Sequence, residues 1–177
     1  PWVDFPRSVD LVRLDGSVLR NVATQPLQET VPIGGVPTGP RSIQWLPSEP
    51  ATLVWFEALD GGDPRAKAEH RDLIRWMTSA GEAREWMRTE HRCQALMLTQ
   101  RAAAALLVEF DRETRTERLW QVNAVDRAAA ARRLWERSTQ DAYGDPGRPV
   151  LRTDARGLAT VRQDGDAIVL SGLGASS

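Results

Sequence analysis

The sequence predicts an all-β fold, specifically a partial β-propeller of four-stranded antiparallel blades. Short runs rich in β-branched and aromatic residues, bounded by Gly, Pro, Asp and Asn, fill most of the 177-residue chain. Such runs recur in the same order after about fifty residues, a period typical of propeller blades, which cannot bury both faces alone. The chain therefore accommodates about three blades of a larger ring.

The expected strands follow the apolar runs, and two dipeptides mark tight reversals between them. Asp15-Gly16 and Asp164-Gly165 supply the backbone freedom that short hairpin turns require. In chain order, the expected strands span 8–14, 18–22, 43–45, 52–57, 72–77, 85–88, 94–99, 104–110, 117–122, 133–136, 150–153, 158–162 and 167–171.

The internal repeat is visible in three pairs of segments. REWMRTE at 84–90 resembles RRLWERS at 132–138, which makes Trp86 and Trp135 equivalent positions. DLIRWM likewise resembles ERLWQV, and ATLVWFE has its counterpart in AALLVEF. The repeat predicts a partial blade at 1–22, complete blades at 42–88 and 94–136, and a second partial blade at 148–171.

Successive turns of an up-and-down blade alternate between the two ends of its strands. The long connections are therefore expected together at one end, which we take as the candidate functional end. This end would collect 23–41, 58–71, 89–92, 137–149 and the turn at 163–166, whereas mostly short connections would lie at the other end.

A helical alternative remains open for the alanine- and arginine-rich segments, because Ala and Arg are good helix formers. A helix at 127–133 would be tolerated as an insertion between strands. The run at 101–107 stands at the position of a repeated strand, so we expect it to be extended.

Composition argues against several classes of partner. The chain has 23 basic and 24 acidic residues, so no surplus of positive charge is present for nucleic acid. No apolar run is long enough to span a membrane. The start at Pro1-Trp2-Val3, without Met, is interpreted as an interior position of a longer protein, so a targeting sequence could have been lost. The single cysteine, Cys93, is expected to be a buried apolar residue.

His70, Arg71, His91 and Arg92 are the candidate substrate-binding residues. Each His–Arg pair follows a glutamate on the candidate functional end. One interpretation is that these groups form ion pairs that tie loops together; the other is that they present positive charge to an acidic ligand or a partner domain. Two histidines beside arginines make a poor cation site, so we expect no metal.

No catalytic set is expected within the chain, and no cofactor. G-x-S-x-G is absent, and Glu57 and Asp60 are assigned to strand-end and turn positions rather than to acid–base chemistry. The Gly34-Gly35 and Gly61-Gly62 pairs lack the strand–loop–helix context of a phosphate site.

Several strings, taken together, resemble the propeller domain of prolyl oligopeptidase family serine peptidases, closest to the glutamyl endopeptidase branch. They are VPIGGVPTGPRS at 31–42, EALDGGDP at 57–64, EHRD at 69–72, RTEHR at 88–92, QDAYGDPGRP at 140–149 and RQDGDAI at 162–168. The segments 78–83 and 123–133 depart from the family pattern.

The resemblance implies a much longer parent chain whose C-terminal α/β-hydrolase domain is the partner of this propeller and carries the Ser–Asp–His triad. It also implies peptide substrates, a propeller that limits access to the active site, and a periplasmic or secreted location. A different class of function stays open, a stand-alone propeller that binds proteins or peptides. In either case the open blade edges would favour pairing with further strands or self-association.

Overall fold

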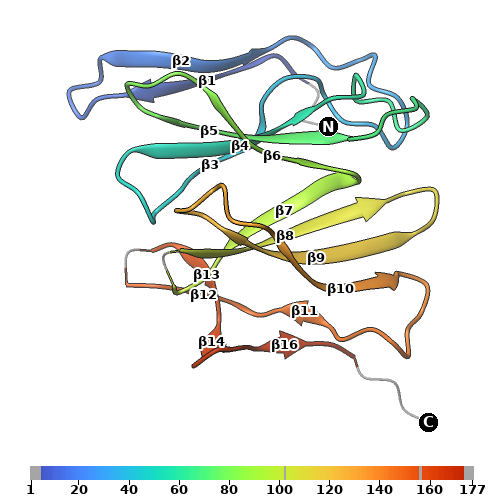
Figure 1. The fold of residues 1–177 in the computed structure, drawn as a ribbon. Helices are drawn as coiled ribbons and strands as arrows, with labels where there is room; N and C mark the ends of the chain where they lie inside the picture. Colours follow the sequence, from blue (N-terminus) through green and yellow to red (C-terminus); the bar gives the residue numbers. More distant parts are fainter. Residues whose placement is uncertain (1–4, 102, 156, 174–177) are drawn as a thin grey trace. The chain divides into compact units, whose positions relative to one another are not determined.

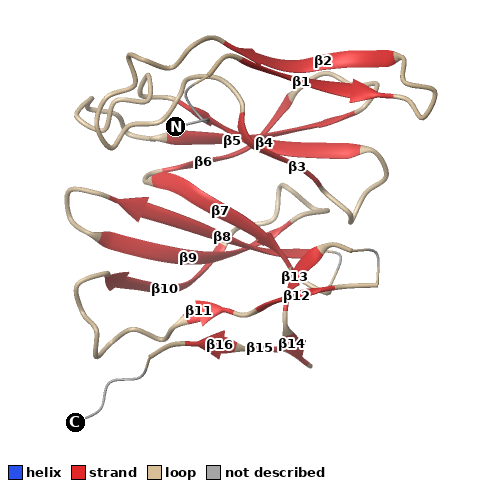
Figure 2. Cartoon of the chain, turned by 180° about the vertical axis from the view of Figure 1, so that it is seen from behind, coloured by secondary structure: helices blue, strands red, loops and turns tan. Residues whose placement is uncertain are grey.

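The computed structural model describes residues 5–101, 103–155 and 157–173, and these residues form strands, turns and loops without any helix (Figures 1 and 2). Positions 1–4, 102 and 156 of the expected blades lie outside this description. Two compact units divide the chain, residues 1–45 with 50–90 and residues 46–49 with 91–177. The predicted all-β class is confirmed.

The first unit begins with a hairpin of β1 (Arg7–Val12) and β2 (Val18–Gln25). Its turn contains the expected Asp15-Gly16 pair. Gly16 has a φ of 84°, and the Asp15 carboxylate accepts a 2.8 Å hydrogen bond from the Ser17 backbone N–H. The turn thus reverses the chain because glycine tolerates the left-handed backbone and aspartate satisfies a free amide.

A four-stranded antiparallel sheet completes the first unit, with its strands in sequence order (Figure 1). It consists of β3 (Arg41–Trp45), β4 (Thr52–Ala58), β5 (Asp72–Thr78) and β6 (Arg84–Thr89). Leu53, Trp55 and Met77 form a core cluster against which Leu11 and Val22 of the hairpin pack. The run 53–56 is buried on both faces, which explains why its sequence is continuously apolar rather than alternating.

The second unit repeats this arrangement in another four-stranded antiparallel sheet. Its strands are β7 (Arg92–Leu98), β8 (Ala104–Asp111), β9 (Thr116–Asn123) and β10 (Arg132–Ser138), again neighbours in sequence order. Leu106, Leu119 and Val161 form its core cluster, with Met97 and Trp135 among the side chains packed against it.

The sequence repeat corresponds strand by strand to the two sheets. Val54 of β4 pairs with Trp76 of β5, and Leu107 of β8 pairs with Trp120 of β9. Trp86 and Trp135 occupy the fourth strand of their respective sheets. Two equivalent four-stranded meanders, with additional open strands, identify the fold as a partial β-propeller.

The C-terminal strands are less regular than expected. The three expected strands of the last partial blade are each interrupted, at Val150, Arg162 and Val169. Val150 N–H donates to Val169 C=O, Val169 N–H to Arg162 C=O, and Arg162 N–H to Val150 C=O, at 2.9, 3.0 and 2.7 Å. This closed triangle of hydrogen bonds joins three two-stranded pieces: β11 (Arg148–Pro149) with β16 (Leu170–Ser171), β12 (Leu151–Thr153) with β13 (Ala159–Val161), and β14 (Gln163–Asp164) with β15 (Ala167–Ile168).

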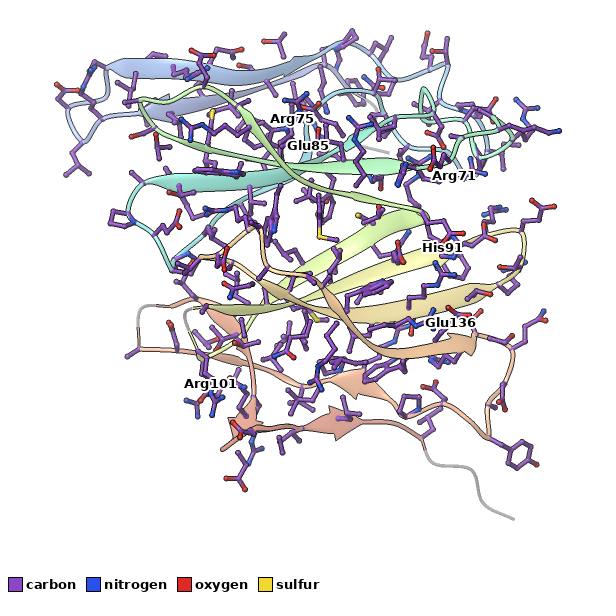
Figure 3. The ribbon with its side chains drawn as sticks, viewed as in Figure 1. Arg71, Arg75, Glu85, His91, Arg101 and Glu136 are labelled. Carbon is purple, nitrogen blue, oxygen red and sulfur yellow. The ribbon has the colours of Figure 1, made fainter. Side chains whose placement is uncertain are left out.

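This interruption moves the turn at 163–166 away from the candidate functional end. Val161 pairs in parallel with Thr99, so the following residues continue past the end of β7, where Asp166 pairs with Arg101. Figure 3 shows Arg101 and His91 at opposite ends of this sheet. The expectation that 163–166 joins the long connections was therefore wrong.

The segment at 127–133 does not form the alternative helix. Residues 127–129 belong to a turn and bend, in which the Ala128 amide donates to Asp126, and β10 begins at Arg132. The Arg127 guanidinium pairs with Glu49 at 2.7 Å. Pairing of β10 with β9 and this ion pair outweigh the helix propensity of the alanines, which is worth less than about 1 kcal/mol per residue.

Candidate functional site

The long connections of the first unit leave from one end of its sheet. Ala58, the last residue of β4, pairs with Asp72, the first residue of β5, and Asp72 pairs with Thr89 at the end of β6. The loop at 59–71 and the link after Thr89 therefore start side by side, as the up-and-down pattern predicts.

Arg71 lies at this end, and its side chain turns into its own loop (Figure 3). The guanidinium donates 2.9 Å hydrogen bonds to the buried Asp60 carboxylate and to the Ala66 carbonyl. Its backbone continues the sheet, because Arg71 N–H donates to Thr89 C=O and Arg71 C=O accepts from Leu59 N–H. Arg71 thus fixes the loop from inside, and only 19% of its side chain is exposed.

Two glycines lock the 59–71 loop to the 31–40 loop of the same unit. The Val36 amide donates to the Gly62 carbonyl at 3.0 Å. A side chain on Gly62, which has a φ of 78°, would collide with the Val36 carbonyl oxygen, and one on Gly35 would collide with Gly62 C=O. Gly34-Gly35 and Gly61-Gly62 thus allow the backbones of the two loops to lie in close contact.

His70 lies beside this locked pair of loops and is partly exposed. The nearby rim carries Arg65, whose side chain is 81% exposed and pairs with Asp63 at 3.0 Å. Hydrogen bonds from the Arg65 side chain and amide lower the pKa of Asp63. The end of the first unit therefore presents charged groups on a rigid backbone.

In the second unit, His91 and Arg92 stand at the start of β7. The backbone N–H of His91 donates to the Glu109 carboxylate at 3.2 Å. This carboxylate also accepts a 2.7 Å hydrogen bond from the Trp120 indole. Glu109 is 1% exposed and Arg92 is 9% exposed, whereas His91 is partly exposed. His91 is therefore the more accessible member of its pair.

Glu109 belongs to a line of opposite charges across the second sheet that the sequence analysis did not identify. Arg118 lies 3.6 Å from Glu109 and donates to Glu136 at 2.6 Å, and Glu136 also accepts from Arg133 at 2.6 Å. These contacts follow the strand register, in which Arg118 pairs with both Glu109 and Glu136. Aligning the repeated strands would have revealed the alternation of charge.

Glu57 and Asp60, which were assigned to strand-end and turn positions rather than to acid–base chemistry, have structural partners. Glu57 accepts hydrogen bonds from the Trp55 indole at 2.7 Å and from Arg75 at 2.9 Å, while Asp60 is held by Arg71 and accepts from the Gly62 amide. Cys93 is buried. Across the described ranges, no three His, Cys, Asp or Glu side chains form a group that could hold a metal ion.

The described part of the chain also contains no helix that is long and apolar enough to cross a membrane. The site residues predicted from sequence occupy two units, with His70 and Arg71 in the first and His91 and Arg92 in the second. Within each unit the histidine is accessible, and the arginine is largely enclosed by its own loop or strand.

The fold and these loops define a class, a segment of a β-propeller whose long connections gather at one end of the first sheet. Comparison with curated proteins then shows which known proteins the chain is similar to. The chain is 35% identical to a probable chloroplastic glutamyl endopeptidase of Oryza sativa subsp. japonica and 31% identical to one of Arabidopsis thaliana. Both alignments cover 99% of this chain, and the expected resemblance to glutamyl endopeptidases is confirmed.

The chain spans only about a fifth of the length of these relatives, 20% and 19% respectively. It therefore aligns with a segment of these larger relatives. No family model matches the chain, and no solved structure matches it significantly.

Proposed function

We propose that this chain is a non-catalytic β-propeller portion of a serine peptidase of the glutamyl endopeptidase kind. In this role it limits access to the active site and helps to position peptide substrates for a hydrolase domain encoded elsewhere in the parent chain. The observation that carries the proposal is similarity over 99% of the chain to two proteins named as probable glutamyl endopeptidases. The all-β repeated fold supports the propeller assignment.

The candidate residues enter this proposal in two ways. His70 and His91 are accessible, so they supply the contacts with an acidic substrate group or with the hydrolase domain. Arg71 and Arg92 contribute positive charge, and Arg71 also holds the loop that precedes it through Asp60 and Ala66. Guanidinium and imidazole groups at this end of the sheets would favour a carboxylate, because both donate hydrogen bonds and the guanidinium carries positive charge.

The proposal is tested first with the complete protein that contains these residues. A fluorophosphonate probe should label a serine outside the 177 residues, and added peptide substrates should slow this labelling by competing for the active site. A complete protein that takes up no label would contradict the peptidase assignment. It would favour the stand-alone propeller that binds proteins or peptides.

Substrate positioning is tested with paired peptides that differ only in Glu or Gln before the cleaved bond. His70→Ala and His91→Ala should each reduce kcat/KM more for the Glu peptide than for the Gln peptide. Lys67→Ala is the matched control, since Lys67 is an exposed cation of the same loop that was not selected as a site residue. Equal losses on both peptides would exclude charge recognition by the histidines.

Limited access is tested by substrate size. Loosening the two locked loops with Gly62→Ala should raise cleavage of an unfolded protein relative to a short peptide, because the entrance becomes less rigid. Gly61→Ala is the control, since a side chain there meets nothing within 4 Å. An unchanged ratio for both variants would contradict a gating role for these loops.

A further inference from the structure

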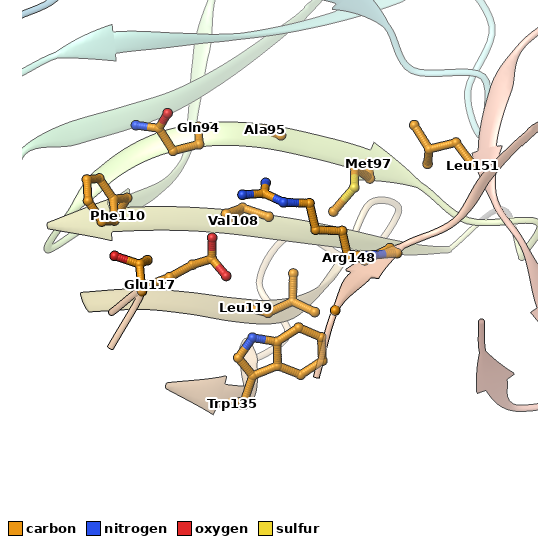
Figure 4. A pocket seen from close by; sticks show the side chains of 13 residues that line it. Gln94, Ala95, Met97, Val108, Phe110, Glu117, Leu119, Trp135, Arg148 and Leu151 are labelled. Atoms are coloured by element: carbon orange, nitrogen blue, oxygen red, sulfur yellow. The ribbon is translucent and has the colours of Figure 1, made fainter. Parts of the chain in front are cut away.

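The second unit contains a cavity of about 670 Å³ that the proposed function does not use. Residues of its four-stranded sheet and of the segment 147–151 line it. Met97, Val108, Phe110, Leu119 and Leu151 make much of the wall apolar (Figure 4). Its volume lies within the range of small-molecule sites, roughly 300–1,000 Å³.

The wall carries one positive charge that the protein does not neutralise. Glu117 lines the cavity, but its carboxylate is paired with Arg137 at 3.0 Å. Arg148 also lines the cavity, and its side chain extends over Val108 (Figure 4). Arg148 is exposed, and its guanidinium has no hydrogen bond or ion pair with any residue that the structure describes, so water solvates it when the cavity is empty. The cavity therefore offers an unpaired guanidinium beside apolar surface.

A second donor without a partner lies in the same wall. The indole Nε1 of Trp135 is buried and finds no acceptor within the described ranges. Buried donors are normally satisfied, so a small adjustment that brings an acceptor to this N–H would be favourable. The Arg148 guanidinium and the Trp135 indole N–H are both hydrogen-bond donors, and neither has an acceptor among the described residues.

We propose that this cavity binds the C-terminal residue of a peptide, with its carboxylate on Arg148 and its aromatic or aliphatic side chain against the apolar wall. Charge complementarity decides the occupant, because a neutral apolar group would leave the guanidinium unpaired. An aspartate or glutamate side chain would leave most of the apolar wall uncovered, since it carries few carbon atoms. The site is distinct from His70, Arg71, His91 and Arg92 and does not depend on their role.

The test uses two probes that differ in charge alone, N-acetyl-phenylalanine and N-acetyl-phenylalaninamide. Both are titrated by calorimetry into the complete protein that contains these residues. The acid should bind at least about tenfold more tightly than the amide, the effect of one charge-assisted hydrogen bond. N-acetyl-glutamate, which carries a side-chain carboxylate on a short stem, should bind more weakly than N-acetyl-phenylalanine.

Two variants separate charge from shape. Arg148→Gln should weaken the acid about tenfold and leave the amide unchanged, whereas Ala95→Phe should fill the cavity and abolish binding of both. Arg112→Gln, an exposed arginine in the β8–β9 turn outside the cavity, is the charge-matched control and should change neither affinity. Unaltered thermal unfolding of Arg148→Gln would show that the variant folds.

Three outcomes would overturn the proposal. Acid and amide could bind equally, Arg148→Gln could behave like Arg112→Gln, or the complete protein could bind neither probe because another segment of the chain fills the cavity. The last outcome would be visible in a structure of the complete protein. None of these results bears on the fluorophosphonate test, so the two proposals fail separately.

Discussion

The guanidinium of Arg41 on β3 pairs with the fully buried carboxylate of Asp72 on β5, across the intervening strand β4. The same guanidinium lies over the ring of Phe56, 5.5 Å from its centroid. Asp72 is the first residue of β5 and follows Arg71 directly. The end of the sheet that carries the candidate residues is thus anchored by a buried ion pair.

Asp72→Asn should destabilise the protein by about 3 kcal/mol, because it replaces the buried carboxylate that faces the enclosed Arg41 charge with a neutral amide. Urea unfolding measures the loss. Glu82→Gln is the control, because the Glu82 side chain is 93% exposed and its ion pair with Arg20 is long, at 4.0 Å. This substitution should change the free energy of unfolding by less than about 0.5 kcal/mol. Similar losses in both variants would show that the buried pair contributes no more than a surface pair.

Gly62→Ala and Gly61→Ala separate backbone strain from close contact. Both positions have a positive φ, 78° and 68°, so alanine costs about 1 kcal/mol at either. Only Gly62 meets a backbone oxygen, that of Val36, so its replacement should cost about 2 kcal/mol more. Thermal and urea unfolding measure the difference. If the two variants are equally stable, the loops are not locked by this contact.

Arg71→Met should loosen the 59–71 loop, because the Asp60 carboxylate and the Ala66 carbonyl lose the hydrogen bonds from the Arg71 guanidinium. Trypsin cleavage after Lys67 should accelerate about tenfold, which corresponds to loss of one charge-assisted hydrogen bond. Arg88→Met, which breaks an exposed pair with Glu85, is the control and should leave cleavage at Lys67 unchanged. A loop that stays resistant in Arg71→Met would show that other contacts hold it.

Stability should fall in acid partly through Asp111. Burial raises the pKa of Asp111, but hydrogen bonds from the Thr114 hydroxyl and amide lower it more, so the net pKa lies below the usual 3.8. A carboxyl with a lowered folded pKa stabilises the protein above its unfolded value and loses that contribution as the pH falls through the folded value.

Asp111→Asn should therefore be less stable than the parent protein by at most about 1 kcal/mol at pH 7, since the site is partly solvated. This difference should vanish near about pH 2, where the parent carboxyl is protonated as well. Urea unfolding at several pH values follows it, with Glu113→Gln in the same turn as the control. A gap that persists in strong acid would assign the loss to packing instead.

The sequence predicted the regular strands well because their signals are local. Four consecutive apolar residues at 53–56 indicate a strand covered on both faces, and the structure places β4 at Thr52–Ala58. The repeat then locates β8, because residues 104–110 occupy the same place in the second sheet. Strand existence and order follow from apolar periodicity and repetition.

The sequence could not predict the C-terminal junction or the partners of the site residues. The breaks at Val150, Arg162 and Val169 arise because three segments pair around one point, and no local signal marks such a meeting. The role of Arg71 depends on Asp60 and Ala66, which only a folded loop brings to its guanidinium. The neighbourhood of Glu109 likewise depends on strand register.

Periodicity, turn residues and repetition along the chain were sufficient to determine an all-β propeller segment, its hairpins and the end of the first sheet that carries the long loops. Tertiary structure alone decided which charges meet, which arginines are enclosed and where a cavity with an unpaired guanidinium remains. The physical reason is the range of the interactions. Strand formation depends on neighbours within a few residues, whereas ion pairs and cavities depend on side chains that only register and packing bring together.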